Sequence, residues 1–167
     1  TQRVLSTKYS PKTLAVNPLN KNLIVLERDY NCLSETQRNI QRQQVSEEHK
    51  SSDYLELEQS KVGYPVAASE KKWASCLRIV DPLMMETEYL HEFEDNRTAF
   101  SLYVSSDKVG LLNQHYMFVG VGVNAGLNLE CQQAFIYTYV FPATNPNVPQ
   151  LIHKTPCEFI PKCFSEL

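Results

Sequence analysis

The sequence predicts an all-β protein built from antiparallel β-propeller blades. Short β-rich runs recur along the chain, and turn residues separate them at intervals of about 10 to 20 residues. After the first third of the chain, no long amphipathic helix interrupts this rhythm. The runs also fall into two sets of four, which is the strand number of a propeller blade. We therefore expect about two blades of a larger propeller, with a polar, partly helical insert.

The first two β-rich runs are predicted to form a hairpin. They cover Lys12 to Val16 and Asn22 to Arg28. The connection between them, from Asn17 to Asn20, contains the Asn and Pro residues that favour a tight turn.

An insert at residues 34–69 separates this hairpin from the rest of the chain. Its first part is rich in Gln, Glu, Arg and Ser, and only Ile40 and Val45 are apolar. Ser34 and Gln37 have the spacing of a capping box, which predicts the start of a largely solvated helix. The second part is predicted to be a loop, because helix-breaking residues recur in it. These breakers are Ser51, Ser52, Gly63, Pro65 and Ser69.

Six further runs after the insert are predicted to be strands. They are Trp73 to Val80, Thr87 to Glu94, Thr98 to Ser105, His115 to Val123, Ala134 to Phe141 and Gln150 to Thr155. Turn residues separate them at Asp81-Pro82, Asp95-Asn96, Asp107 to Gly110, Asn124 to Gly126 and Pro142 to Pro149.

The strand order predicts how the chain is divided. We expect residues 1–167 to belong to one partial propeller domain, with a first blade at 12–94 and a second at 98–155. Residues 156–167 are predicted to start the next blade. Since a propeller needs at least four blades to close, two blades leave open sheet edges that call for more chain or a partner. A two-sheet sandwich is the structural alternative.

Composition narrows the classes of function. The 16 Lys and Arg residues are scattered and the net charge is -3, so direct nucleic-acid binding by this segment is not expected. The longest apolar stretch, Met117 to Leu127, is too short for a membrane span and no signal peptide precedes it. The five cysteines are odd in number and widely spaced, which favours a reducing compartment over a disulfide framework. The chain starts at Thr1 rather than Met, and we expect both ends to be cuts in a longer protein.

One stretch nominally fits a dinucleotide-binding fingerprint. Gly120 and Gly122, followed by Asn124 and Ala125, match the G-x-G-x-x-G/A pattern. That site needs a helix directly after the glycines and an acidic residue about 20 positions further on, and the sequence predicts neither. We interpret the glycines as permitting close packing on an inner strand, and we expect no cofactor.

Metal binding and catalysis are equally weakly supported. Cys157 and Cys163 lie near each other and His153 could add a third ligand, but no fourth is evident, so no metal site is expected. No nucleophile elbow occurs. Glu92 and Glu94 fall on one face of a predicted outer strand, where exposed acids are usually solvated surface. We expect no catalytic residue and no enzyme activity.

Three further features are interpreted as structural. Phe135, Tyr137 and Tyr139 alternate with other bulky residues, which favours a strand buried in the core over a binding platform. Trp73, the single tryptophan, is expected to anchor its blade rather than a partner. The glycosylation sequon at Asn96 is attributed to chance.

The order of several short strings resembles a known family. The chain is similar to the start of the third propeller of the splicing factor 3b subunit 3 family, and the resemblance covers nearly the whole chain. The strings are Tyr9-Ser-Pro-Lys12, Asn17-Pro18, Asn22-Leu-Ile-Val-Leu26, a Gln/Arg-rich stretch at Gln37 to Gln44, Trp73-Ala-Ser75, Arg78-Ile-Val with Pro82, Ala99-Phe-Ser101, Phe118-Val-Gly-Val121, Phe135-Ile-Tyr-Thr-Tyr139 and His153-Lys-Thr-Pro156.

Two departures from the family pattern point to a divergent species. The insert from Gln44 to Val62 is shorter and less aliphatic than in the family. Cys131-Gln-Gln133 stands where a small, Gly-containing turn is usual. The same propeller superfamily includes the large damaged-DNA-binding protein subunit and the large subunit of the cleavage and polyadenylation specificity factor.

The resemblance implies a non-catalytic, nuclear scaffold that acts in pre-mRNA splicing. The implied partners are the helical-repeat large subunit and a small subunit of splicing factor 3b, within the U2 small nuclear ribonucleoprotein of the spliceosome. A sister scaffold of a ubiquitin ligase or DNA-repair complex, or of mRNA 3′-end processing, is the alternative, and a nucleotide-binding oxidoreductase is a remote one. A secreted, lectin-like sandwich is disfavoured by the missing signal peptide and the odd cysteine count. No partner-binding residue is assigned, because the matching strings are strand cores.

Overall fold

The computed structural model describes residues 4–48, 68, 71–105 and 114–165. The described chain contains one α-helix, α1 (Glu35–Glu48), and eight strands. The strands are β1 (Pro11–Val16), β2 (Leu23–Tyr30), β3 (Trp73–Asp81), β4 (Glu86–Glu92), β5 (Arg97–Val104), β6 (Tyr116–Val123), β7 (Gln133–Val140) and β8 (Gln150–Cys157). Nearly all of the predicted loop from Ser51 to Ser69, and the predicted turn from Asp107 to Gly110, lie outside the described residues.

The strands form two antiparallel sheets of four. The first sheet has the order β1-β2-β3-β4 and the second the order β5-β6-β7-β8. Each sheet therefore pairs strands in sequence order without a crossover, as the blades of a propeller do. The all-β prediction and the two sets of four strands are confirmed. The assignment of residues 156–167 to a further blade stays a prediction.

The predicted hairpin between the first two strands is present. The backbone N–H of Asn17 donates to the carbonyl of Asn22 over 2.8 Å, and the N–H of Lys21 donates to the carbonyl of Asn17 over 2.9 Å. The side chain of Asn17 also accepts the N–H of Leu19, which forms an Asx turn within the predicted tight connection. Lys21 has a φ of 66°, the left-handed conformation that ends this turn.

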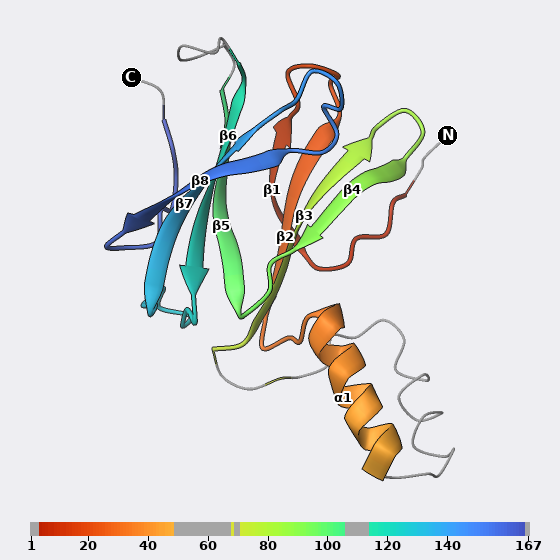
Figure 1. Ribbon diagram of the computed structural model, residues 1–167, viewed down its shortest axis with the longest axis vertical. Coiled ribbons are helices and arrows are strands. Elements are labelled where there is room, and N and C mark those ends of the chain that lie inside the picture. Colours follow the sequence, from red (N-terminus) through yellow and green to blue (C-terminus); the bar gives the residue numbers. More distant parts are fainter. Residues whose placement is uncertain (1–3, 49–67, 69–70, 106–113, 166–167) are drawn as a thin grey trace.

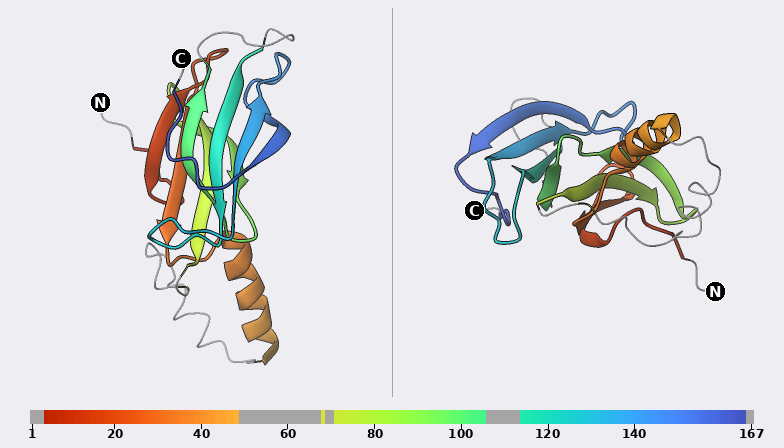
Figure 2. Two further views of the ribbon diagram at one scale, coloured as in Figure 1. Left: turned by 90° about the vertical axis from the view of Figure 1, so that its left-hand side faces the viewer. Right: turned by 90° about the horizontal axis from the view of Figure 1, so that it is seen from below.

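The helix begins as the capping box predicts. The backbone N–H of Gln37 donates to Ser34 Oγ over 3.2 Å, and the N–H of Ser34 donates to Gln37 Oε1 over 3.4 Å. Ile40 is 49% exposed, in agreement with the predicted solvated helix. Figures 1 and 2 show α1 projecting from one end of the sheets rather than covering a face.

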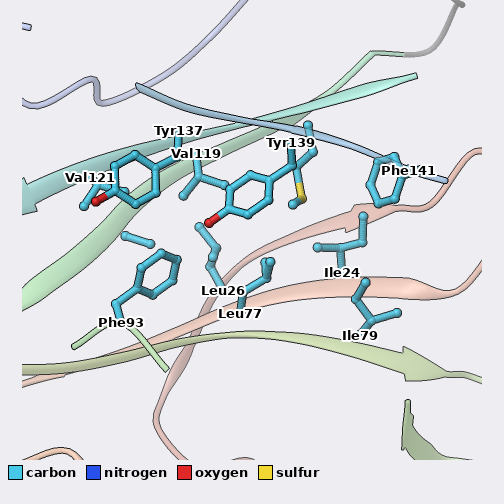
Figure 3. Close-up of a cluster of buried hydrophobic side chains, with 12 residues drawn as sticks. Ile24, Leu26, Leu77, Ile79, Phe93, Val119, Val121, Tyr137, Tyr139 and Phe141 are labelled. Atoms are coloured by element: carbon cyan, nitrogen blue, oxygen red, sulfur yellow. The ribbon is translucent and has the colours of Figure 1, made fainter. Parts of the chain in front are cut away.

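A shared hydrophobic core joins the two sheets face to face. Strand alternation turns every second side chain inward, so Ile24 and Leu26 of β2 meet Tyr137 and Tyr139 of β7 (Figure 3). The buried cluster consists of Ile24, Leu26, Leu77, Ile79, Phe93, Ala99, Met117, Val119, Val121, Tyr137, Tyr139 and Phe141. This cluster therefore draws its residues from both sheets.

Polar contacts fasten one end of the interface between the sheets. Trp73 Nε1 of β3 donates to the carbonyl of Ala125 over 2.8 Å, and its ring contacts Phe100 of β5 at 5.4 Å between centroids. Asn96, in the link between the sheets, accepts the backbone N–H of Trp73 over 2.9 Å and donates to Asn124 Oδ1 over 2.8 Å.

A second set of polar contacts fastens the other end. Asn147, in the loop between β7 and β8, accepts hydrogen bonds from the side-chain amides of Asn20 and Asn22. The nearby Pro146 carbonyl accepts Asn17 Nδ2 over 2.7 Å. The β1–β2 turn of the first sheet is thus tied to the β7–β8 loop of the second, and the two sheets are joined at both ends.

Candidate interaction surfaces

A network that we call the polar junction lies on the face of the first sheet that points away from the core. It comprises Lys8, Tyr9, Glu27, Arg78 and Glu92. The strand register aligns Glu27 of β2 and Glu92 of β4 with Cys76 of β3 in one row across the sheet. The segment that precedes β1 crosses this row and brings Lys8 and Tyr9 to the two carboxylates.

Glu27 is the buried centre of the junction, with no exposed surface. Arg78 Nε donates to Glu27 Oε1 over 2.5 Å, and Arg78 Nη2 lies 3.4 Å from Oε2. The backbone N–H groups of Lys8 and Tyr9 donate to Oε2 over 2.8 and 3.0 Å. A buried carboxylate is tolerated only when it is paired and its lone pairs are satisfied, and these contacts meet both conditions.

Glu92 connects the junction to the start of α1. The hydroxyl of Tyr9 donates to its carboxylate, and Lys8 Nζ lies 3.3 Å from Oε1. The backbone N–H of Glu35 and the hydroxyl of Thr36 point to the same carboxylate over 3.4 and 3.5 Å. A negative charge at a helix N-terminus is favourable, because the first N–H groups of a helix lack partners within it. Glu92 therefore holds α1 on the first sheet.

The interpretation of Glu92 as a solvated surface acid is wrong. The Glu92 side chain is only 13% exposed, whereas Glu94 lies beyond the end of β4 and is exposed. Burial raises the pKa of Glu92, but the hydrogen bond from Tyr9 and the charge of Lys8 outweigh it and bring the pKa below its ordinary value. The error arose because the partners come from the N-terminal segment and α1, far from Glu92 in sequence.

A second surface, the aromatic face, lies on the side of the second sheet that points away from the core. It consists of Tyr103, Tyr116, Phe118, Ile136 and Thr138. The rings of Tyr103 and Tyr116 stack on Phe118 with centroids 6.3 and 6.4 Å apart. Along β6 and β7, core residues alternate with these positions. Because successive side chains of a strand point to opposite faces, the residues between the core positions point outward.

The chain after β8 crosses this face along the two glycines of β6. A Cβ atom at Gly120 would lie 2.5 Å from the carbonyl oxygen of Pro161, and one at Gly122 would lie 2.6 Å from Ile160 Cδ1. Ser101 Oγ of β5 donates to the same Pro161 carbonyl over 2.5 Å. The predicted role of the glycines in close packing on an inner strand is confirmed.

A groove opens beside this crossing segment. Its volume is about 450 Å³. One wall is Phe164, whose ring lies 6.3 Å from that of Phe118. The lining is Tyr103, Ser105, Phe118, Ile136, Thr138, Thr155, Phe164 and Ser165. Among the described residues, the lining contains aromatic, aliphatic and hydroxyl groups and no charged side chain.

The structure does not bring the other predicted candidates together. The chain after Gly122 continues into a loop and then β7, as expected, and not into the helix that a dinucleotide site needs. Among the described residues, no group of three or more His, Cys, Asp or Glu side chains could hold a metal ion. All five cysteines are free, and Cys163 is exposed. No helix in the described part is long and apolar enough to cross a membrane.

The structural interpretations of Tyr137, Trp73 and Asn96 agree with the structure. Tyr137 lies in the shared core. Trp73 is buried at the interface between the sheets. Asn96 is buried and its amide nitrogen donates to two protein oxygens, an arrangement that leaves no room for a glycan.

Sequence reasoning missed the pairing of Glu27 with Arg78. A partial signal exists, since Glu27 directly follows an apolar run in β2 and Arg78 interrupts an apolar run in β3, and the two charges are opposite. Fifty-one positions separate the pair, however, and the insert lies between them. Only the register of β2 against β3 shows that they are neighbours.

Comparison with known proteins identifies similar chains among splicing proteins. The chain is 29% identical to "Splicing factor 3B subunit 3" of Danio rerio over 171 residues, which are 92% of this chain and 14% of that protein. It is 27% identical to "Spliceosome-associated protein 130 A" of Arabidopsis thaliana over 183 residues, with 96% of this chain and 15% of that protein covered. It is also 29% identical to "Pre-mRNA-splicing factor RSE1" of Mycosarcoma maydis, with coverages of 96% and 13%. No protein-family model matches the chain.

These matches confirm the predicted resemblance to splicing factor 3b subunit 3. They extend over nearly the whole chain in a fish, a plant and a fungal protein. The chain spans only about a seventh of the length of these relatives, between 13 and 15%.

Proposed function

We propose that this chain, a homologue of one stretch of splicing factor 3b subunit 3, is part of a scaffold that acts in pre-mRNA splicing. The observation that carries the proposal is the similarity over 92–96% of the chain to three proteins named for splicing or the spliceosome. Its place of action is the nucleus, within the splicing factor 3b complex of the U2 small nuclear ribonucleoprotein. The whole scaffold is a propeller protein, of which these residues supply about two blades.

The structure supports a binding role for this segment. Two sheets joined by a continuous core and by polar contacts at both ends form a rigid frame. Rigid frames that present loops and inserts are well suited to holding partners, because binding requires no reactive group. Within the described residues, the insert presents α1, which starts at the polar junction.

The proposed partners are the other splicing factor 3b subunits. These are the helical-repeat large subunit and a small subunit, together with the wider spliceosome. With a net charge of -3, the chain has little to attract RNA phosphates, so contact with RNA is assigned to neighbouring subunits. The chain acts without catalysis, cofactor or metal.

Affinity purification of the full-length protein from nuclear extract tests the proposal. We expect splicing factor 3b subunits among the recovered proteins. Recovery of a ubiquitin ligase, or of a polyadenylation complex, without splicing subunits would reassign the scaffold to a sister pathway. The remote oxidoreductase alternative is tested by thermal unfolding with a saturating nicotinamide dinucleotide, because a ligand that binds only the folded state raises the unfolding temperature. We expect no shift.

A variant of the polar junction tests the binding role of α1. Glu92→Gln removes the charge that holds the helix N-terminus, whereas Glu94→Gln changes an exposed acid nearby. If α1 presents a contact surface, Glu92→Gln lowers the recovery of at least one subunit and Glu94→Gln does not. Equal recovery with both variants would remove α1 from the binding surface.

A further inference from the structure

The turn between β3 and β4 carries two adjacent apolar side chains that are exposed. Leu83 is 79% exposed and Met84 is 63% exposed, and we call this pair the hydrophobic tip. Turns are usually built from small or polar residues, because their side chains contact water. Exposed apolar side chains that lie together, unlike single ones, mark surfaces that bind other molecules.

The turn holds the hydrophobic tip in a fixed conformation. Asp81 Oδ1 accepts the backbone N–H groups of Leu83 and Met84 over 2.7 and 3.1 Å. The backbone N–H of Met85 donates to the carbonyl of Asp81 over 2.8 Å, and Met85 has a φ of 59°, the left-handed conformation that ends the turn. The ring of Pro82 also restricts the backbone. A turn that is already ordered loses little conformational entropy when it binds a partner.

The hydrophobic tip lies at the end of the sheets opposite α1 (Figure 1). The β1–β2 turn and the β7–β8 loop lie at the same end. Asn147 connects these parts, because it donates to Glu88 Oε2 of β4 over 3.4 Å and accepts the side-chain amide of Asn20. Leu19 and Val148 add partly exposed apolar surface on the two neighbouring connections. The tip therefore protrudes from a surface whose parts are hydrogen-bonded to one another.

Negative charge borders the hydrophobic tip and restricts the chemistry of its partner. Residues 81–88 include Asp81, Glu86 and Glu88 and contain no Lys, Arg or His. The cation of the preceding strand, Arg78, is paired with the buried Glu27. Acidic side chains repel the phosphates of nucleic acids and of anionic lipid surfaces. Charge complementarity favours a protein surface with basic side chains.

We propose that the hydrophobic tip is an anchor that inserts into an apolar pocket, bordered by Lys or Arg side chains, on a separate protein. Burial of Leu83 and Met84 in the pocket removes apolar surface from water, and this supplies the affinity. Glu86 supplies charge that matches the basic border of the pocket. The inference goes beyond the proposed function, because it assigns a contact at the end of the sheets that α1 does not reach.

Photo-crosslinking of the full-length protein in nuclear extract tests this inference. A benzoyl-phenylalanine replaces Met84, and the crosslinked peptides are identified by mass spectrometry. We expect one site on a separate protein, at which Lys or Arg side chains border an apolar pocket. Leu83 is the second position if the first variant does not fold. Leu127, 67% exposed in the loop after β6, is the matched control position and should not give this product.

Charge reversal tests the basic border of the pocket. Glu86→Lys, combined with the crosslinker at Met84, should lower the yield by about threefold or more, the order of effect that one exposed ion pair supplies. Glu130→Lys makes the same change of net charge at an exposed position in the loop between β6 and β7, and it should leave the yield unchanged. Equal yields with Glu86→Lys and Glu130→Lys would overturn the charged contact and with it the proposed pocket.

The remaining outcomes separate this inference from the proposed function. A crosslink from Met84 to the same polypeptide, to a second copy of it, to lipid, or to no molecule would overturn the anchor. The same holds for the same product from Met84 and from Leu127. Recovery of splicing factor 3b subunits without a crosslink from Met84 would contradict the anchor alone. A charge-sensitive crosslink to a protein outside the splicing machinery would support the anchor, and the splicing role would then be decided by the purification.

Discussion

Glu27 and Arg78 form a buried ion pair between the two central strands of the first sheet. The Arg78 Nε donates to Glu27 Oε1 over 2.5 Å, and Arg78 Nη1 donates to Thr87 Oγ1 over 2.8 Å. Because Glu27 has no exposed surface, its charge depends on this guanidinium and on two backbone N–H groups. The pair thus links β2, β3 and β4 with the segment that precedes β1.

The first prediction concerns the removal of the guanidinium. Arg78→Met keeps much of the side-chain volume but leaves the Glu27 carboxylate buried without its cationic partner. Breaking a buried pair in this way costs about 3–5 kcal/mol of the free energy of unfolding. Urea unfolding of the 167-residue chain measures this loss.

Arg97→Met is the matched control for this prediction. Arg97 also pairs with a carboxylate over 2.5 Å, that of Asp95, but the Asp95 side chain is 75% exposed. Exposed ion pairs contribute only about 0–1 kcal/mol. Equal losses for Arg78→Met and Arg97→Met would show that burial of Glu27 does not determine the cost.

The strands of this fold were predictable from sequence, whereas the polar junction was not. Strand positions follow from local properties, such as the turn chemistry of Asn17 to Asn20 and the alternation of large residues around Tyr137. The partners of Glu27 and Glu92 depend instead on the register of β2, β3 and β4 and on the path of the chain before β1. Both are long-range features, and the insert further increases the separation in sequence between β2 and β3.

The second prediction concerns the acid sensitivity of the chain. Burial raises the pKa of Glu92, yet Tyr9 and Lys8 bring it below its ordinary value of 4.5. A carboxylate with a lowered pKa in the folded state adds stability that is fully present above the ordinary value and is lost as the pH falls through the folded value. Glu92→Gln removes this contribution to stability, so the unfolding free energy should fall less steeply below about pH 4.5 than in the wild type.

Urea unfolding between neutral and acidic pH measures this second prediction. Glu94→Gln is the control, since Glu94 is exposed, and it should retain the wild-type pH dependence. An unchanged acid dependence in Glu92→Gln would mean that the contacts with Tyr9 and Lys8 do not favour the ionised carboxylate.

The glycines of β6 show what a sequence pattern can and cannot establish. Their spacing fits a nucleotide fingerprint, but the predicted strand after them argued for a packing role, and the structure supports that role. The partner against which they pack was not predictable, because Ile160 and Pro161 follow them by about forty positions and belong to no strand. The local pattern indicated that another segment packs closely on the glycines. Only the tertiary structure identifies that segment as the one containing Ile160 and Pro161.

The third prediction compares the two glycines. Gly120→Ala places a methyl group 2.5 Å from the backbone oxygen of Pro161, whereas Gly122→Ala meets the movable end of Ile160. Overpacking against backbone costs about 1–3 kcal/mol, so we expect Gly120→Ala to lower the unfolding free energy more than Gly122→Ala. Faster amide exchange at residues 162–164 should accompany it, because the crossing segment is displaced.

Gly126→Ala is the control for the glycine variants. An added Cβ there meets only the side-chain oxygen of Asn128 within 3 Å, in a loop. We expect little change in amide exchange at residues 162–164. If Gly120→Ala left the exchange of these residues at the wild-type rate, the close approach of Pro161 to Gly120 would not hold the segment after β8 in place.

The fourth prediction concerns cooperativity between the sheets. Trp73, the single tryptophan, lies in β3 of the first sheet and donates its indole N–H to Ala125 beside the second. Its fluorescence therefore reports the separation of the sheets, while far-ultraviolet circular dichroism reports the loss of strands. Because the core residues Leu26 and Tyr137 belong to one cluster that spans both sheets, separation of the sheets would expose this cluster to water. The two signals should change at the same urea concentration, as in a two-state transition. A fluorescence change that precedes the circular dichroism change would mean that the sheets part before their strands unfold, and the frame would then be two units rather than one.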